Sequence, residues 1–212
     1  MPSTVLLLRH AQSEWNAIGL WQGQADPPLS AEGRRQATVA ATRIAREQWF
    51  DGFDLVASSD LARARQTAEL LIDALGVMRV PLLDEGLREF DAGEWSGHTL
   101  PEIEERWPGE VDRFTHGLLD SPPAGENRHA FDLRVAAATA RIAELSAQGG
   151  ARSVLMVAHG GVVGSIARSA GLARRHIGHL AGYLGQITEG GLFPEEPVDL
   201  LEAPELVVDT AK

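Results

Sequence analysis

The chain has 212 residues, no cysteine, and a formal net charge of −11 from 19 basic and 30 acidic side chains. The length is typical of one domain with a sizeable core, and we expect residues 1–212 to form a single domain. The absence of cysteine excludes disulfides, thiolate metal sites and a cysteine nucleophile. Lys212 is the only lysine, which excludes a P-loop and an internal Schiff-base lysine.

Charge and hydropathy also restrict partners and location. The net negative charge argues against nucleic acid and anionic membrane as partners, because their phosphates would be repelled. The first eight residues have no basic segment, and their apolar run is too short for a signal peptide. No stretch approaches the roughly 20 apolar residues that span a bilayer. We therefore expect a cytoplasmic protein.

Strand and helix patterns alternate along the chain. Short apolar runs without a helical stripe predict buried strands at residues 4–8, 54–57 and 153–158, with weaker candidates at 80–83 and 183–188. Helical spacing of apolar residues predicts helices at 30–49, 60–75, 99–107, 129–147 and 161–170. The segment 11–29 looks irregular, and an acidic, proline-punctuated tail follows Thr188. This order predicts an α/β three-layer sandwich, with helices on both faces of a mostly parallel central sheet.

The carboxyl ends of the predicted strands carry the chemically interesting side chains. In parallel sheets these ends form the ligand site. The first predicted strand is followed by Arg9, His10, Ser13 and Asn16. The second is followed by Ser58, Ser59 and Arg63, and the strand at 153–158 by His159, Gly160 and Gly161. Guanidinium forks match phosphate oxygens, and glycine N–H groups at a helix start bind anions. A neutral histidine nitrogen can attack phosphorus. The residues at these strand ends therefore predict a phosphate-binding site.

A histidine nucleophile in such a site needs two further features. Like-charge repulsion from Arg9 and Arg63 is expected to lower the pKa of His10 and to keep its attacking nitrogen unprotonated. The leaving alkoxide needs a proton donor, for which Glu89 is the best candidate. From the residues alone, Asp91 and Glu94 in the same segment remain alternatives.

Four ordered blocks resemble the histidine phosphatase superfamily, which is also called phosphoglycerate mutase-like. The segment LRHAQSEWN (8–16) is similar to its R-H-G-x-[ST]-x-x-N signature. GQADPPLSAEGRRQA (23–37) resembles the segment that follows this signature. The second arginine block, the acidic block and the second histidine block are matched by SSDLARARQTA (58–68), LREFDAGEWSG (87–97) and VAHGG (157–161).

The resemblance implies a role for each matching residue. His10 would be the phosphorylated nucleophile, and Glu89 the general acid and then the base. Arg9, Arg63 and His159 would bind the phosphoryl oxygens, with His159 protonated in the complex. The neutral substrate-binding groups would be Ser13, Asn16, Gln22, Gly23 and Gly160. The implied fold is an α/β sandwich, and the implied chemistry needs no metal and no cofactor.

Two features bear on activity and substrate. Ala11 stands where the family usually has glycine, and its methyl group could crowd the phosphate or exclude a positive φ. Residues 95–128 are expected to form an insertion at the substrate mouth. Within it, Trp107, Phe114 and Leu118 are candidates for an apolar wall. Arg106, Arg113 and Arg128 are candidates for contacts with a second anionic group. Arg174, outside this insertion, is expected to be a solvated surface residue.

The favoured function is a phosphatase that hydrolyses small phosphomonoesters through a phosphohistidine. The short chain and the sequence FDAGEWSG favour it over a phosphoglycerate mutase. A non-catalytic phospholigand binder would not need both His10 and Glu89. A metal site made of His10, His159 and carboxylates conflicts with the arginines, and His176 and His179 are expected to be exposed histidines. The expected partner is a small phosphorylated metabolite, and a homodimer is compatible with the sequence.

Overall fold

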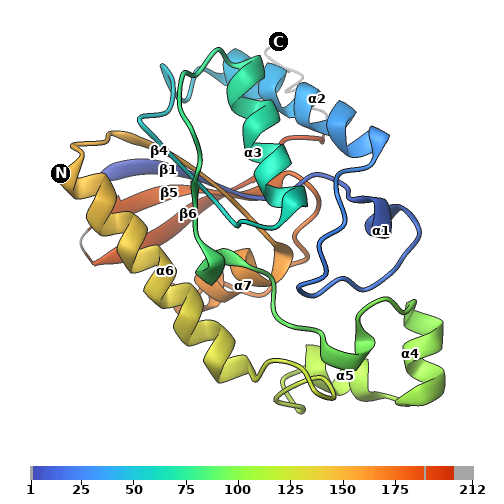
Figure 1. Ribbon diagram of the computed structural model, residues 1–212. Helices are drawn as coiled ribbons and strands as arrows, with labels where there is room; N and C mark the ends of the chain where they lie inside the picture. The colour runs from blue at the N-terminus through green and yellow to red at the C-terminus, as the bar shows by residue number, and fades with distance from the viewer. Residues whose placement is uncertain (1, 189, 203–212) are drawn as a thin grey trace, which may run out of the picture.

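A six-stranded sheet runs through the middle of the molecule (Figure 1). The computed structural model describes residues 2–188 and 190–202. The strands are β1 (Ser3–Arg9), β2 (Leu55–Ser58), β3 (Leu82–Leu83), β4 (Ser153–Ala158), β5 (Ala181–Thr188) and β6 (Gly191–Asp199). Their spatial order is β3-β2-β4-β1-β5-β6, and the first four are parallel. Only β5 runs against its neighbours β1 and β6, so the sheet is mostly parallel, as predicted.

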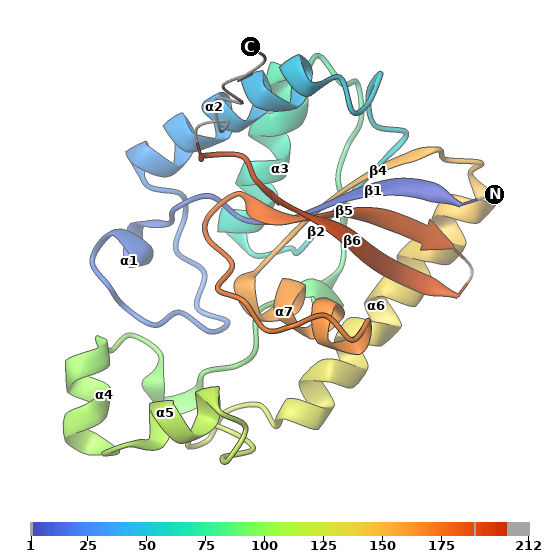
Figure 2. The ribbon, with the colours of Figure 1, turned by 180° about the vertical axis from the view of Figure 1, so that it is seen from behind.

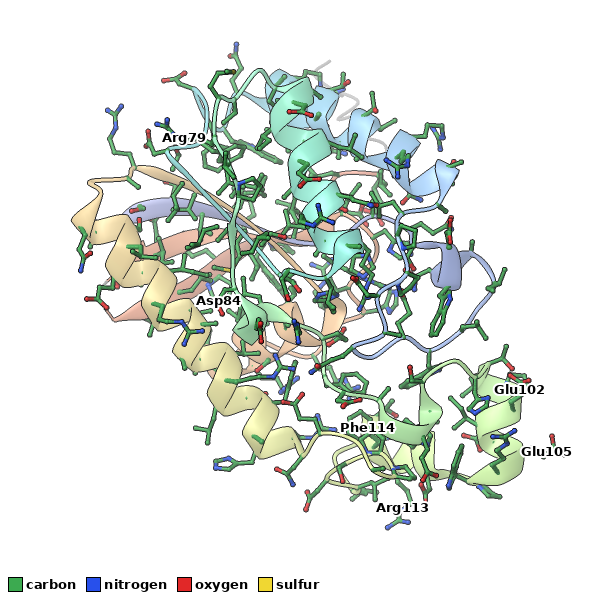
Figure 3. The ribbon with its side chains drawn as sticks, viewed as in Figure 1. Arg79, Asp84, Glu102, Glu105, Arg113 and Phe114 are labelled. Atoms are coloured by element: carbon green, nitrogen blue, oxygen red, sulfur yellow. The ribbon has the colours of Figure 1, made fainter. Side chains whose placement is uncertain are left out.

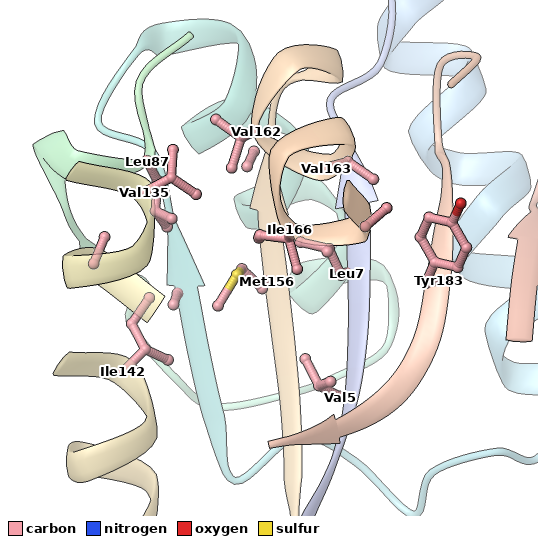
Figure 4. Packing of buried hydrophobic residues seen from close by; sticks show 14 of the residues in the cluster. Val5, Leu7, Leu87, Val135, Ile142, Met156, Val162, Val163, Ile166 and Tyr183 are labelled. Carbon is pink, nitrogen blue, oxygen red and sulfur yellow. The ribbon is translucent and has the colours of Figure 1, made fainter. Parts of the chain in front are cut away.

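Helices cover both faces of this sheet. One face packs against α2 (Ala31–Glu47) and α3 (Ala62–Ala74), and the other against α6 (Arg128–Gln148) and α7 (Gly160–Ser169) (Figures 1 and 2). Because side chains alternate along a strand, Leu6 and Leu8 of β1 join the core under α2 and α3. Val5 and Leu7 join the core under α6 and α7 (Figure 4). The predicted three-layer sandwich is confirmed.

Polar side chains cap the starts of α2 and α6. Ser30 accepts a hydrogen bond from the N–H of Gly33 at 2.9 Å and begins α2. Asn127 does the same for α6 through the N–H of His129, also at 2.9 Å. The start of α3 has no cap of its own, and Asp26 from the preceding loop accepts from the N–H of Ala62 instead. This cap ties the loop after β1 to the start of α3.

The remaining elements are short. They are α1 (Glu14–Ala17), α4 (Leu100–Arg106), α5 (Glu110–Thr115) and 3₁₀ turns at Glu85–Leu87 and Gly93–Trp95. Both ribbon views show α4 and α5 side by side, outside the three layers. Their small core contains Trp95, Ile103 and Phe114, and it extends to Trp21 and Phe90 of the main body.

Three elements differ from the sequence prediction. α1 and α5 lie in segments without a detectable helical stripe. β6 occupies the segment predicted as an acidic tail. It contains Pro194 and Pro197, which a strand tolerates because β6 is the edge of the sheet. Residues 203–212 of that tail lie outside the described residues. Within the described part of the chain, no helix has the length and apolarity needed to cross a membrane.

Candidate active site

The two predicted histidines are neighbours at the carboxyl edge of the sheet. β1 and β4 pair in parallel with Arg9 opposite Ala158, so His10 and His159 leave the sheet side by side. The N–H of His10 donates to the carbonyl of Ala158 at 2.9 Å. The two imidazole rings meet edge to face, with centroids 5.1 Å apart, and both side chains are buried. The topology thus brings together two residues that are 149 positions apart in the sequence (159 − 10).

The tautomer of His10 is set by a backbone contact. Its Nδ1 lies 2.6 Å from the carbonyl oxygen of Ala11, which can only accept, so Nδ1 carries the proton. Nε2 is then the unprotonated nitrogen. Burial lowers the pKa of His10 well below its usual value, and the charges of His159, Arg63 and Arg9 lower it further. The arginines act as predicted, but burial is the largest cause.

Arg63 is almost completely buried at the start of α3, with 1% of its surface exposed. Two of its nitrogens donate to the carbonyls of Gly23 (2.8 Å) and Ala25 (2.7 Å), while Nε has no partner among the described residues. Gly23 has φ +51°, and a Cβ there would come within 2.5 Å of the Ala92 nitrogen. Gly23, predicted to bind substrate, therefore also holds Arg63 in place.

Four buried nitrogens around His10 lack a partner among the described residues. They are Nε of Arg9, Nε of Arg63 and both ring nitrogens of His159. Arg9 is held by a hydrogen bond from its Nη1 to the carbonyl of Ile177 at 2.8 Å. The pKa of His159 is held well below its usual value by burial and then by the charges of Arg63 and Arg9. Buried polar groups are normally paired, so this arrangement fits an anion that supplies the missing acceptors.

Glu89 reaches the same place from the segment after β3. One carboxylate oxygen accepts from the N–H of Gly161 at 2.9 Å, and the other from the N–H of Phe90 at 3.0 Å. A Cβ on Gly161 would lie 2.1 Å from the carboxylate, so this close approach requires glycine. The other two candidate acids are placed elsewhere: Asp91 accepts from the N–H of Gly93 within its own turn, and Glu94 is exposed.

Arg134 of α6 holds the segment that carries Glu89, and no sequence pattern pointed to this role. Its guanidinium donates to the carbonyls of Gly86 (3.1 Å), Arg88 (2.7 Å) and Glu89 (2.8 Å). It also binds the carboxylate of Glu126 with two hydrogen bonds of 2.7 Å. Arg134 therefore fixes the backbone position of the candidate acid from the neighbouring helix.

The neutral polar residues take different positions. Asn16 and Gln22 line a cavity of about 290 Å³ together with Arg9, His10, Gly23, Arg63 and Glu89. Ser13 is fully buried; its hydroxyl lies 2.7 Å from Oε1 of Gln22 and accepts from the N–H of Asn16 as the cap of α1. Ser13 thus positions both neighbours. Gly160 lines a larger adjoining cavity of about 630 Å³.

Ala11, which replaces the expected glycine, does not strain the backbone. Its φ is not positive, and its N–H donates to Oγ1 of Thr67 at 3.1 Å. Its methyl group packs in the core under α2 and α3 and lines neither of these two cavities. Neither concern raised by the sequence, a positive φ or crowding of the phosphate, is supported by this geometry.

His179 was predicted to be exposed, which is wrong. It is half-buried, its ring centroid is 5.8 Å from that of His10, and its Nδ1–H donates to the His10 carbonyl at 3.2 Å. Burial and then the charge of Arg9 lower its pKa to about 4, so it is neutral near pH 7.

In the described part of the chain, no group of three histidine or carboxylate side chains is arranged to hold a metal ion.

The segment 95–128 contributes two of its candidate side chains to the larger cavity. Phe114 and Arg128 line that cavity. Leu118 is 70% exposed, and Trp107 packs against the small core instead. Arg106 is exposed and bonded to His98, and Arg113 is also exposed. Figure 3 shows Arg113 directed away from the molecule while Phe114 points inward. Arg174, expected on the solvated surface, lines this cavity too.

Known proteins are similar to this chain over much of its length. The sequence model of the Histidine phosphatase superfamily (branch 1) matches residues 5–189. A glucosyl-3-phosphoglycerate phosphatase of Mycolicibacterium vanbaalenii is 36% identical over 166 residues, which is 76% of this chain and 71% of that protein. A 2,3-bisphosphoglycerate-dependent phosphoglycerate mutase of Methylobacterium radiotolerans is 35% identical over 137 residues, covering 64% of each chain.

Solved structures have the same fold. A phosphoglycerate mutase from Bacillus anthracis superposes with a TM-score of 0.81 at 23% identity, covering 94% of both chains. A mycobacterial glucosyl-3-phosphoglycerate phosphatase superposes with a TM-score of 0.76 at 27% identity, covering 92% of this chain and 97% of that one. The chain belongs to the histidine phosphatase superfamily. Phosphatases are among its relatives, which supports its assignment as an enzyme of this class.

Proposed function

We propose that this protein is a phosphatase that hydrolyses small phosphomonoesters through a phosphohistidine on His10. One observation carries the proposal: the unpaired nitrogens of Arg9, Arg63 and His159 surround a histidine whose Nε2 is unprotonated. Arg9, Arg63 and His159 would bind the phosphoryl oxygens. The Nε2 of His10 would attack phosphorus. Asn16, Gln22 and the Gly160 N–H would add neutral contacts to the bound ester.

In the first step, the Nε2 lone pair of His10 forms the N–P bond and the ester P–O bond breaks. The leaving oxygen takes a proton from Glu89 in its acid form. The cations of Arg9 and Arg63 stabilise the negative charge on the phosphoryl oxygens in the transition state. A bound phosphate dianion would raise the pKa of His159, which can then donate a proton to the same oxygens.

In the second step, water attacks phosphorus and the N–P bond breaks. The Glu89 carboxylate accepts the proton of the attacking water, which restores its acid form, while His10 regains its free Nε2 and phosphate leaves. Two observations support this double role: Glu89 lines the cavity that holds His10, and it is fixed by the N–H of Gly161 and by Arg134. Arg134 holds the backbone of Glu89 and is a positioning residue.

The proposal includes metal independence and a cytoplasmic location. Guanidinium groups supply the positive charge that a divalent cation would otherwise supply, and Arg9 and Arg63 would repel such a cation from the same cavity. The expected substrates are charged metabolites that do not cross membranes unaided. An enzyme that acts on them is therefore expected in the compartment where they are made. A homodimer stays a prediction, which sedimentation can test.

The test is phosphate release from a panel of phosphomonoesters, with product analysis by chromatography. The expected result is stoichiometric phosphate and alcohol from the wild type with EDTA present, and no turnover by His10→Ala. Activity that requires added Mg²⁺ or Zn²⁺ would contradict the metal-independent mechanism. Conversion of 3-phosphoglycerate to 2-phosphoglycerate without phosphate release would indicate a mutase instead.

A further inference from the structure

A second cavity adjoins the one that holds His10. Its volume is about 630 Å³, and it shares Arg9, Trp21, Glu89 and Phe90 with the smaller cavity. Its size falls within the range of sites that hold whole small molecules, and a phosphoryl group would already be bound in the smaller cavity. The larger cavity is therefore the place for the body of the substrate.

The wall of this cavity is basic in a chain whose net charge is −11. Besides Arg9 it is lined by Arg128, Arg168, Arg174 and Arg175. Arg168 is paired with Asp132 at 2.9 Å, and the carboxylate of Glu126 is neutralised by Arg134. Within the described residues, Arg128, Arg174 and Arg175 have no carboxylate within ion-pair distance. Three guanidinium charges thus face one cavity without a counter-ion.

Arg128 is the most firmly held of the three. Its guanidinium lies over the ring of Phe114, 4.7 Å from the centroid, and donates to the carbonyl of Phe114. Its Nε is buried and has no partner among the described residues. Burial and then the charge of Arg168 lower the pKa of Arg128, and the charge of Arg174 lowers it as well. A buried, unpaired donor that is repelled by its neighbours favours an anion at this point.

Arg174 and Arg175 belong to the segment between α7 and β5. Arg174 donates to the carbonyl of Thr115, the last residue of α5, and the Arg175 guanidinium lies 5.8 Å from the ring centroid of Tyr183. The same segment supplies the Ile177 carbonyl that binds Arg9. One segment therefore contributes to the proposed phosphoryl site and to the basic wall, which fixes their relative position.

We propose that Arg128, Arg174 and Arg175 bind a second anionic group of the substrate, a carboxylate or a second phosphoryl group, while the ester phosphate lies beside His10. The inference rests on the proposed function and adds the substrate class to it. Because these three arginines line the larger cavity and not the smaller one, the two anions must be separated by a spacer. Phosphate esters of uncharged alcohols would lack the second contact.

Two matched pairs of probes test this inference. 3-Phosphoglycerate carries a carboxylate where glycerol 3-phosphate has a CH2OH group, and 6-phosphogluconate differs from sorbitol 6-phosphate in the same way over a longer spacer. In at least one pair, the wild type is expected to favour the carboxylate by about 10- to 100-fold in kcat/KM, the size of one charge-assisted hydrogen bond. The pair that shows the preference for the carboxylate indicates the length of the spacer between the two anionic groups of the substrate.

The variants remove the basic wall while leaving the proposed phosphoryl site unchanged. In Arg128→Gln and in the double variant Arg174→Gln/Arg175→Gln, the preference for the carboxylate is expected to fall about tenfold or more, mainly through KM. Arg106→Gln is the matched control, because Arg106 is exposed and outside the cavity. The double variant changes two exposed side chains, so it keeps the test valid if Arg128→Gln folds poorly.

Binding measurements separate this inference from the proposed function. In a His10→Ala background, calorimetric titration is expected to show tighter binding of the carboxylate member of the pair, and the double variant should remove the difference. Equal binding and equal kcat/KM within both pairs would overturn the inference while leaving a phosphatase intact. Absence of turnover with every ester, together with the binding difference, would overturn the proposed function and leave the anion site standing.

Discussion

Glu89→Gln tests the acid–base assignment. Both carboxylate oxygens of Glu89 accept backbone N–H groups, from Gly161 at 2.9 Å and from Phe90 at 3.0 Å. An amide has one oxygen, so the variant leaves one of these N–H groups unpaired, which costs about 1–3 kcal/mol of folding free energy. The larger effect is on catalysis, since a positioned general acid contributes about 10²–10⁴-fold.

The loss in Glu89→Gln should depend on the leaving group. An alkyl phosphate such as glycerol 3-phosphate expels a poor leaving group, so its kcat/KM should fall by about 10²–10⁴-fold. p-Nitrophenolate leaves without a proton, so with p-nitrophenyl phosphate stopped-flow absorbance should show a rapid burst of about one equivalent. A slow steady state follows, because water attack on the phosphohistidine lacks its base.

Glu94→Gln is the matched control for this experiment. Glu94 is exposed, and it lines neither cavity of the site. It should show ordinary kinetics with both esters, and so should Asp91→Asn once its lower stability is taken into account, because Asp91 caps only its own turn. Glu89 is not the general acid if Glu89→Gln loses the same factor with both esters, or if Asp91→Asn shows the burst and Glu89→Gln does not.

Three further predictions concern the rest of the site. Arg63→Lys keeps the charge but loses the fork that holds two carbonyls, so kcat/KM should fall about 10- to 100-fold, whereas Arg35→Lys on the exposed surface should change it less than twofold. Ala11→Gly removes a buried methyl group and should lower stability by about 1 kcal/mol in chemical denaturation without raising kcat/KM; a gain in activity would contradict the placement of that methyl in the core. Sulfate binding near pH 7 should take up a proton, because the pKa of His159 is low in the free enzyme and rises beside an anion. Calorimetry in buffers of different ionisation enthalpy should show this, His159→Asn should abolish it, and the absence of buffer dependence in the wild type would contradict it.

The sequence was sufficient to predict the positions of His10 and His159 because local patterns determine them. Each follows a short apolar strand, and parallel strands bring their carboxyl ends to one edge. The same argument predicted Arg63 near that edge. Choosing Glu89 over Asp91 and Glu94 required the resemblance to a family, since nothing in the local pattern distinguishes three acids in one irregular segment.

Long-range contacts were not predictable in this way. Arg134 holds the backbone of Glu89 from 45 residues away, and on the sequence it looks like an ordinary polar position of a helix. His179 and Arg174 follow α7 in a segment without periodicity, so their partners His10 and Thr115 could not be inferred. β6 was missed because prolines argue against a strand unless the strand is known to be an edge.

His10 is expected to carry the phosphoryl group during turnover. Rapid acid-free quenching with a substrate labelled in its phosphoryl group, followed by mass spectrometry of the peptides, tests it directly. We expect a label on His10 that is lost in acid and stable in base, and its complete absence in His10→Ala. His129→Ala, which changes an exposed side chain of α6, should retain the label. A label on a carboxylate, or normal turnover by His10→Ala, would contradict the account.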